Sequence, residues 1–237
     1  MTQVVRYLHD ESHWFPKPDN ALDEPNGLLA IGGDLSPARI HAAYQQGIFP
    51  WFNPDEPILW WSPDPRAVFR VSEFVPSKSL KKRGRKHPWR ITLNHQFLSV
   101  MQACAAPRDQ QGGTWITQSM QQSYLELHRQ GIGHSVEVWD EDTLVGGLYG
   151  LLIGGVFCGE SMFHRQTDAS KIAFWALIEH LKRCGVDWVD AQVPNDHLSS
   201  LGAKAMPRSE FLELLAAHGG KLIDMKLWLP QRITLNV

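Results

Sequence analysis

The sequence predicts an α+β protein: a small N-terminal domain rich in proline and glycine, then a domain built on a mixed, mostly antiparallel sheet. Two observations support this prediction. Residues 12–66 are rich in Pro and Gly and contain one clear helical pattern, whereas helical and strand patterns alternate from residue 67 onward, with hairpins among them. The chain of 237 residues fits one large or two small domains, and its hydrophobic fraction of 43% supplies a proper core.

The N-terminal domain is expected to hold one helix. Ser36 suits the N-cap and Pro37 the first helical position, after which apolar residues recur at helical spacing until Gly47. The next segment, residues 49–54, places two prolines among aromatic residues. We therefore predict that it is a stiff loop.

The boundary between the domains is expected near residues 62–66. Pro63 and Pro65 interrupt any regular element there, which gives domains of residues 1–64 and 65–237. Beyond this boundary, apolar runs between turn residues predict strands, and amphipathic patterns predict helices.

The expected elements of the second domain follow in order. Strands are predicted over residues 67–71, 90–93, 135–140, 144–153, 156–161, 188–192 and 223–228. Helices are predicted over residues 77–86, 95–106, 119–130, 169–183 and 207–217. Asn94 is expected to cap the second of these helices, and Gly131 and Gly185 to end the third and fourth. Residues 141–143 should turn a hairpin.

Composition excludes several classes of protein. The three cysteines are far apart and form no CxxC pair, which argues against a disulfide framework or a zinc ribbon and suits a reducing cytoplasm. No secretory signal is evident, and no stretch approaches the apolar length of a membrane span. The formal net charge of −2 means that any nucleic-acid site has to be a local basic patch.

Polar side chains interrupt two of the apolar strand patterns. Glu160 lies near the end of one predicted strand, and Asp190 and Gln192 lie in another. Buried ionisable groups cost free energy unless they are paired, so a single one would suggest a structural ion pair, whereas the three together favour a functional site. Because side chains alternate along a strand, Asp190 and Gln192 are expected on the same face.

Two further features are open to two interpretations. A basic run on the predicted helix 77–86, with no acidic residue close in sequence, is either a solvated face or a surface for phosphate contacts. Trp51 and Trp115 lie in predicted loops, where a tryptophan either plugs the core or stacks on a base.

Several long motifs together carry a resemblance to a known family. They are residues 24–37 (EPNGLLAIGGDLSP), 44–52 (YQQGIFPWF), 60–66 (WWSPDPR), 113–117 (GTWIT), 157–163 (FCGESMF) and 189–198 (VDAQVPNDHL). In this order they resemble the leucyl/phenylalanyl-tRNA–protein transferases, from about Asn20 to Trp228. The order of elements also resembles the N-acetyltransferase-like (GNAT-like) fold, an analogy that fixes no activity.

The resemblance implies an enzyme that moves Leu or Phe, and also Met, from aminoacyl-tRNA to the α-amine of proteins that begin with Arg or Lys. Such a protein would mark its substrates for degradation in a bacterial N-degron pathway. It would need no metal or small cofactor. It would act in the cytoplasm without contacting membranes, and would bind the acceptor arm and 3′ end of the tRNA. No feature of the sequence argues for an obligate dimer, so a monomer is expected.

The resemblance also implies roles for individual residues. The aminoacyl-adenosine would be held by Trp51, Trp115 and Ser161. The aminoacyl side chain would enter a pocket of Leu148, Phe157, Met162, Leu177 and Val189. The tRNA backbone would contact Lys78, Lys81, Lys82, Arg83, Arg85 and Lys86. Asp190 would orient or deprotonate the attacking amine, with Gln192 hydrogen-bonded between them, and Glu160 would contact the terminal adenosine or the cationic acceptor.

Two other functions remain open at this point. An acetyl-CoA-dependent N-acetyltransferase would share the fold, but residues 165–171 lack the glycines of the usual pyrophosphate loop before the helix 169–183. A non-catalytic RNA-binding module would explain the basic run and the tryptophans. It would leave Glu160, Asp190 and Gln192 unexplained.

Overall fold

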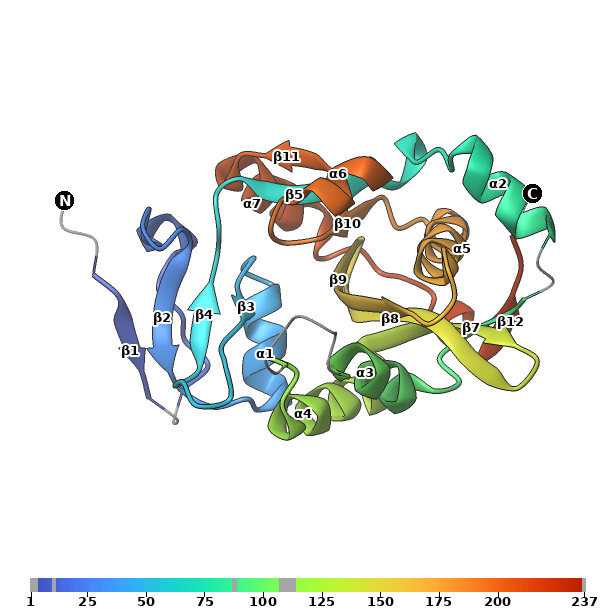
Figure 1. Ribbon diagram of the computed structural model, residues 1–237. Helices are drawn as coiled ribbons and strands as arrows, with labels where there is room; N and C mark the ends of the chain where they lie inside the picture. Colours follow the sequence, from blue (N-terminus) through green and yellow to red (C-terminus); the bar gives the residue numbers. More distant parts are fainter. Residues whose placement is uncertain (1–3, 10–11, 87–88, 107–113, 236–237) are drawn as a thin grey trace.

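The computed structural model describes residues 4–9, 12–86, 89–106 and 114–235. Figure 1 shows two sheets, a small one at the N-terminal end and a large one that occupies the rest of the molecule. Within the described residues, no helix has both the length and the apolar character needed to cross a membrane.

The small sheet has four strands in the order β1-β2-β4-β3. These are β1 (Arg6–Leu8), β2 (Leu28–Gly32), β4 (Leu59–Trp61) and β3 (Phe49–Pro50). The sequence patterns did not predict this sheet, and the expected stiff loop is wrong at Phe49–Pro50, which pairs with β4. The predicted helix is confirmed as α1 (Pro37–Tyr44), and the Ser36 side chain accepts a hydrogen bond from the Arg39 backbone N–H.

The large sheet has eight strands in the order β11-β5-β10-β9-β8-β7-β6-β12. These are β11 (Lys204–Met206), β5 (Arg66–Arg70), β10 (Trp188–Asp190), β9 (Val156–His164), β8 (Thr143–Ile153), β7 (Gly133–Asp140), β6 (Arg90–Leu93) and β12 (Gln231–Ile233). Among the described strands of this sheet, only β9 and β10 pair in parallel, joined by the crossover helix α5 (Ala169–Cys184). The predicted mixed, mostly antiparallel α+β sheet is confirmed.

Helices cover both faces of the large sheet. α5 packs on one face of β7, β8 and β9, whereas α3 (Phe97–Ala105) and α4 (Gln118–Arg129) pack on the other (Figure 1). α2 (Lys78–Lys86) lies against α5, and α6 (Asp196–Leu201) and α7 (Arg208–His218) follow β10. Three short 3₁₀ helices complete the elements of the described chain: η1 (Pro18–Asn20), η2 (Val71–Glu73) and η3 (Met225–Trp228).

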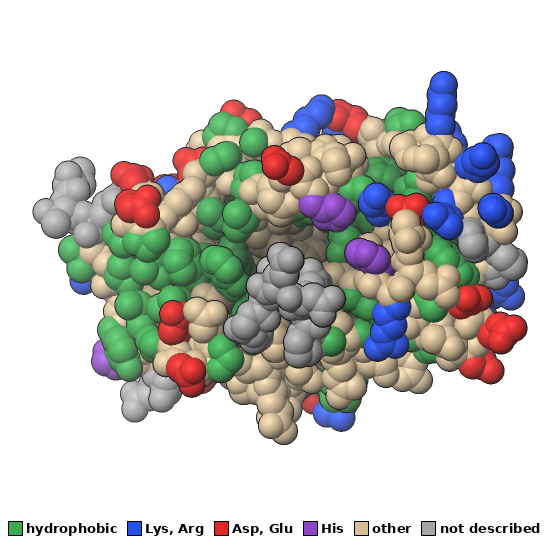
Figure 2. All heavy atoms as spheres, in the orientation of Figure 1, with side chains coloured by type: hydrophobic (Ala, Val, Ile, Leu, Met, Phe, Trp, Pro, Cys, Tyr) green, Lys and Arg blue, Asp and Glu red, His purple; other side chains and the backbone are tan. Residues whose placement is uncertain are grey.

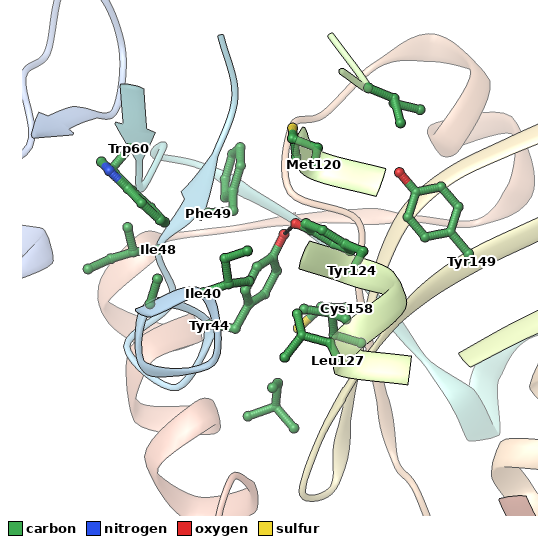
Figure 3. Close-up of a cluster of buried hydrophobic side chains, with 14 of the residues drawn as sticks. Ile40, Tyr44, Ile48, Phe49, Trp60, Met120, Tyr124, Leu127, Tyr149 and Cys158 are labelled. Carbon is green, nitrogen blue, oxygen red and sulfur yellow. Dashed lines mark hydrogen bonds between the residues drawn. The ribbon is translucent and has the colours of Figure 1, made fainter. Parts of the chain in front are cut away.

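One hydrophobic cluster joins the small sheet to the α3–α4 face of the large sheet. It runs from Trp60 and Tyr44 to Tyr124, Leu127 and Tyr149 without interruption (Figure 3). The chain therefore buries apolar surface between its two sheets, and the division into domains 1–64 and 65–237 stays a prediction.

Two predictions about the chain after residue 66 are wrong in detail. Asn94 does not cap α3, which begins at Phe97. Asn94 has a φ of 61°, and the carboxylate of Glu137 accepts from the backbone N–H groups just before the helix. The last predicted strand is instead η3, followed by β12. Contacts between distant segments determine both features, and local sequence patterns do not predict such contacts.

The strand β10 ends two residues earlier than predicted, at Asp190. Gln192 lies beyond it with a φ of 57°, in the left-handed region. The elements that follow, α6 and β11, were not predicted from the sequence because both are short and exposed.

A β-bulge interrupts the pairing of β8 and β9. Tyr149 lies opposite Ser161 and Gly150 opposite Gly159, so Glu160 is an extra residue with no partner across the pair. Bulges of this kind re-aim a side chain beside functional sites. The backbone at the bulge leaves no room for a side chain at Gly150, because a Cβ there would lie 2.2 Å from the carbonyl oxygen of Cys158.

We predict that Gly150→Ala lowers the free energy of unfolding by about 2–3 kcal/mol, because the added methyl group would overpack against fixed backbone. The matched control is Gly220→Ala, where a Cβ would meet nothing within 4 Å. The control should change stability by less than about 0.5 kcal/mol. Chemical denaturation of both variants measures the difference, and equal stabilities would contradict the packing of the bulge.

Candidate active site

A cavity of about 400 Å³ opens between the small sheet and α5. Its wall combines residues of β3, β8, β9 and α5 with the segment after β10. Figure 2 shows the hollow near the centre of this face, with histidine side chains beside it. The cavity therefore takes its wall from segments far apart in the sequence.

The side of the cavity next to α5 is apolar. All five residues predicted for an aminoacyl side-chain pocket line it, together with one that the sequence analysis missed: Leu148, Phe157, Met162, Leu177, Val189 and Phe174. Phe174 belongs to the apolar face of α5, so its pattern alone indicated core. The structure thus brings the predicted set together in a single pocket.

The two tryptophans that the sequence analysis singled out, Trp51 and Trp115, both line the cavity. Trp51 is 49% exposed, and its carbonyl oxygen accepts a hydrogen bond from the indole N–H of Trp61 at 2.6 Å. Trp115 and Ser161 also line the wall, while Gly113 of the GTWIT motif lies outside the described residues. Both rings are therefore available to a flat ligand at this cavity.

The Glu160 side chain projects from the β9 bulge into a polar cluster. Oε1 accepts from the Tyr44 hydroxyl at 2.7 Å and from Nε2 of Gln192 at 3.2 Å, and Oε2 accepts from the Tyr124 hydroxyl at 3.2 Å. Burial raises the pKa of Glu160 to about 7, although the two hydroxyl donors oppose this shift. The carboxyl group therefore titrates near neutrality.

The sequence analysis missed the functional position of Tyr44 and Tyr124. Both were expected in helices, where an aromatic residue at helical spacing indicates core. Each ring is indeed buried, but its hydroxyl reaches the polar cluster. A buried tyrosine needs a hydrogen-bond partner, which is the signal that could have marked them.

Asp190 forms a buried ion pair with Arg66. Nε and Nη2 of Arg66 each donate to one carboxylate oxygen at 2.8 Å, and both side chains are 0% exposed. Nη1 of Arg66 donates to the carbonyl of Gly47, and the rings of Phe49 and Phe211 cover the guanidinium. Although burial alone would lower it, the Asp190 carboxylate raises the pKa of Arg66.

The expectation that Asp190 and Gln192 share one strand face is wrong. Because the strand ends at Asp190 and Gln192 adopts a left-handed conformation, the two side chains take different directions. Oδ1 of Asp190 accepts from the backbone N–H of Gln192 at 3.0 Å, while the Gln192 side chain reaches Glu160. Gln192 lines the cavity, whereas Asp190 lies behind the wall.

The predicted basic helix is confirmed as α2. Its exposed cations border a second hollow: Lys78, Lys81, Lys82, Arg85 and Lys86. Figure 2 shows Lys and Arg side chains gathered at this end of the molecule. Arg83 differs, because its Nε lies 3.4 Å from Oδ2 of Asp168. The basic run therefore has an acidic neighbour in the folded chain.

The start of α6 also borders the cavity. The Asn195 side chain caps this helix by accepting from the Leu198 backbone N–H, and Asn195 and His197 both line the wall. In the part of the chain that the structure describes, no group of three or more His, Cys, Asp or Glu side chains is placed to hold a metal ion.

Comparison with known proteins identifies the family. The family model described as leucyl/phenylalanyl-tRNA protein transferase matches residues 68–216, and that of its N-terminal domain matches residues 33–64. A leucyl/phenylalanyl-tRNA–protein transferase of Shewanella baltica is 56% identical over 233 residues, which is 98% of each chain. That of Shewanella frigidimarina is 57% identical over 232 residues, with the same coverage.

Among solved structures, the C-terminal domain of a putative lysylphosphatidylglycerol synthetase from Agrobacterium fabrum superposes with a TM-score of 0.44 at 9% identity. The match covers 81% of this chain and 73% of that one. Matches to the two family models and to relatives over nearly the whole length agree with the motifs and with the cavity. The chain therefore belongs to the leucyl/phenylalanyl-tRNA–protein transferase family of aminoacyltransferases.

Proposed function

We propose that this aminoacyltransferase moves Leu or Phe, and also Met, from aminoacyl-tRNA to the α-amine of proteins that begin with Arg or Lys. It would thereby mark them for N-degron-dependent degradation in the bacterial cytoplasm. The observation that carries the proposal is one cavity with an apolar end, two tryptophans and a half-buried carboxyl–amide cluster. This combination suits an aminoacyl ester joined to a base.

The apolar end would hold the aminoacyl side chain. The described residues that line this end are Leu, Phe, Met and Val, without a charged group among them, which suits Leu, Phe and Met alike. A methylene in such a pocket changes the binding free energy by only about 1–3 kcal/mol, so discrimination among the three should be modest.

The terminal adenosine would stack on the tryptophan rings. Base–aromatic stacking contributes about 1–3 kcal/mol per base without selecting a sequence. Trp51 and Trp115 supply the rings at the cavity, and Ser161 supplies a hydroxyl beside them. We assign these three residues to the aminoacyl-adenosine.

The chemistry would depend largely on positioning. The ester is already activated, and good orientation of two reactants can supply about 7–11 kcal/mol. Gln192 faces the reacting groups, and we assign Asp190 as the residue that positions it, because one oxygen of Asp190 holds the Gln192 backbone. Both oxygens of Asp190 already accept from Arg66, which leaves this carboxylate poorly placed to take a proton.

The charged groups suit two different partners at two separate places, a cationic acceptor protein and an anionic tRNA. Glu160 would face the positively charged N-terminus of the acceptor protein. The cations of α2, Arg83 included, would contact phosphates of the acceptor arm and add affinity that depends on salt but not on sequence. One chain supplies every side chain of this arrangement, so we propose a monomer.

The decisive test is transfer of labelled Leu or Phe from charged tRNA to a peptide that begins with Arg. The matched control is the same peptide beginning with Ala. Transfer to the Arg peptide alone is expected. Binding of charged tRNA without transfer to either peptide would instead support a non-catalytic RNA-binding protein.

Gln192→Ala should lower kcat by about 100-fold, because a small misplacement of the reacting groups is costly. Its unfolding free energy should change by less than about 1 kcal/mol, since the side chain is only half-buried. Gln166→Ala is the control, because that half-buried glutamine bonds Asp140 outside the cavity. A kcat equal to that of the control would remove Gln192 from the reaction.

Asp190→Asn should lower both kcat and the free energy of unfolding. Removing one partner of a buried ion pair costs about 3–5 kcal/mol, because Arg66 would remain charged and unpaired. Urea denaturation gives the loss of stability. At a temperature where the variant is folded, a lowered kcat with unchanged KM for charged tRNA would indicate positioning of Gln192, whereas wild-type kcat would exclude it.

Replacing Lys81, Lys82 and Arg85 by Ala should weaken tRNA binding and flatten its dependence on salt. Each lost phosphate contact reduces the slope of log K against log salt by about 0.7–0.9. The control removes Arg129 and Lys182, exposed cations that pair with Glu126 and Glu179 away from α2. The same slope in both variants would argue against α2 as the binding surface.

A further inference from the structure

Three side chains from separate elements form a closed ring of hydrogen bonds. The hydroxyls of Tyr44 on α1 and Tyr124 on α4 lie 2.8 Å apart, and Figure 3 shows them pointing toward each other. The carboxyl group of Glu160 on β9 contacts both, at 2.7 Å from Tyr44 and at 3.2 Å from Tyr124. The ring therefore contains three oxygen–oxygen contacts.

The number of hydrogens in this ring depends on Glu160. Two hydroxyls provide two hydrogens, which cannot fill three contacts, so the ring with an ionised Glu160 is one hydrogen short. If Tyr124 donates to Tyr44 and Tyr44 to Glu160, the contact left without a hydrogen is the longest one, at 3.2 Å. A proton on Oε2 of Glu160 would complete the ring. The geometry thus provides a place for one proton.

The surroundings leave Glu160 as the member of the ring that titrates near neutrality. Burial raises the pKa values of Tyr44 and Tyr124 well above the ordinary value, so both keep their hydrogens. Burial raises the pKa of Glu160 to about 7. The other ionisable or polar groups near it are Tyr149 on β8, Cys158 on β9, Arg66 on β5, and Asp190 and Gln192 at the end of β10.

We propose that Glu160 is the proton acceptor of the transfer reaction, and that Tyr44 and Tyr124 position its carboxylate and complete the ring around the accepted proton. This inference rests on the proposed function. It also assigns Glu160 a different task from Asp190, whose oxygens are held by Arg66. Glu160 lines the cavity, as a group that meets the acceptor amine must.

The step balances in protons and bonds. The α-ammonium of the acceptor gives one proton to Glu160, and the freed lone pair attacks the ester carbonyl carbon to form the C–N bond. The bond from that carbon to the ribose oxygen breaks, and this oxygen takes a second proton from the nitrogen. The third hydrogen stays on the new amide, and Glu160 releases its proton to solvent.

A base that titrates near the working pH serves this step well. It is ionised often enough to accept a proton, and its conjugate acid is weak enough to retain it during the attack. An ordinary exposed glutamate, with a pKa near 4.3, would be a much weaker base. The ring and the burial together give Glu160 the required basicity.

The test is the pH dependence of single-turnover transfer to an Arg peptide at saturating concentration. The wild-type rate should rise with Glu160 ionisation, with a midpoint of about 7. The rate of Glu160→Gln should not show this rise with pH. At neutral pH it should be at least about 100-fold below the wild-type rate. Since every variant uses the same peptide, the ionisation of the acceptor amine is common to all.

Tyr44→Phe removes the donor of the 2.7 Å hydrogen bond to the ionised carboxylate, so the midpoint should move upward by about one pH unit. Tyr149→Phe is the matched control, because this buried hydroxyl lies near Glu160 but has no hydrogen-bond partner in the described residues. It should leave the midpoint in place. Equal midpoints in wild type and Tyr44→Phe, or a near wild-type rate for Glu160→Gln, would overturn the proposal.

Infrared spectroscopy separates this inference from the proposed function. The carbonyl band of a neutral carboxyl group, present in wild type and absent in Glu160→Gln, should titrate at about pH 7. Titration near the value of an ordinary glutamate would overturn the ring as the holder of the proton. If the band titrates as expected but the wild type transfers nothing to the Arg peptide, the proposed function fails instead.

Discussion

The buried ion pair between Arg66 and Asp190 is the interaction on which the site depends. It joins β5 to β10, and the third guanidinium nitrogen binds the carbonyl of Gly47 just after α1. Moving two charges out of water costs several kcal/mol per ion, which only near-ideal geometry and further hydrogen bonds offset. Here the bidentate contact, the Gly47 carbonyl and the flanking rings of Phe49 and Phe211 supply that geometry.

This pair fixes the two sheets relative to each other at the cavity. Because Arg66 binds the segment between α1 and β3, that segment is held where Phe49 and Trp51 line the cavity wall. The apolar cluster that runs from the small sheet to α4 also holds the two sheets together. A site assembled from distant segments needs such a support, since positioning is a large part of the catalysis.

Two local irregularities then bring the reactive groups together. The β9 bulge turns Glu160 out of the strand pairing, and the left-handed conformation turns Gln192 away from β10. As a result the two side chains meet at 3.2 Å, although regular strands would have separated them. The same bulge places Glu160 beside Tyr44 and Tyr124, and the burial there makes its carboxyl group basic.

The sequence by itself determined the α+β class, the helix that Ser36 begins, most of the larger strands and helices, and the family. These follow from local patterns and motifs, because hydrophobic period, caps and turns act over a few residues. The sequence also selected Glu160, Asp190 and Gln192, since polar groups in apolar runs are costly.

Only the tertiary structure decided the small sheet, whose short strands are stabilised by pairing between distant segments. It alone revealed the ion pair of Asp190 with Arg66, the bulge at Glu160, and the hydroxyls that surround it. The physical reason is that hydrogen bonds between residues far apart in the chain leave no periodic trace in the sequence, and burial, not residue type, sets the proton affinity of Glu160.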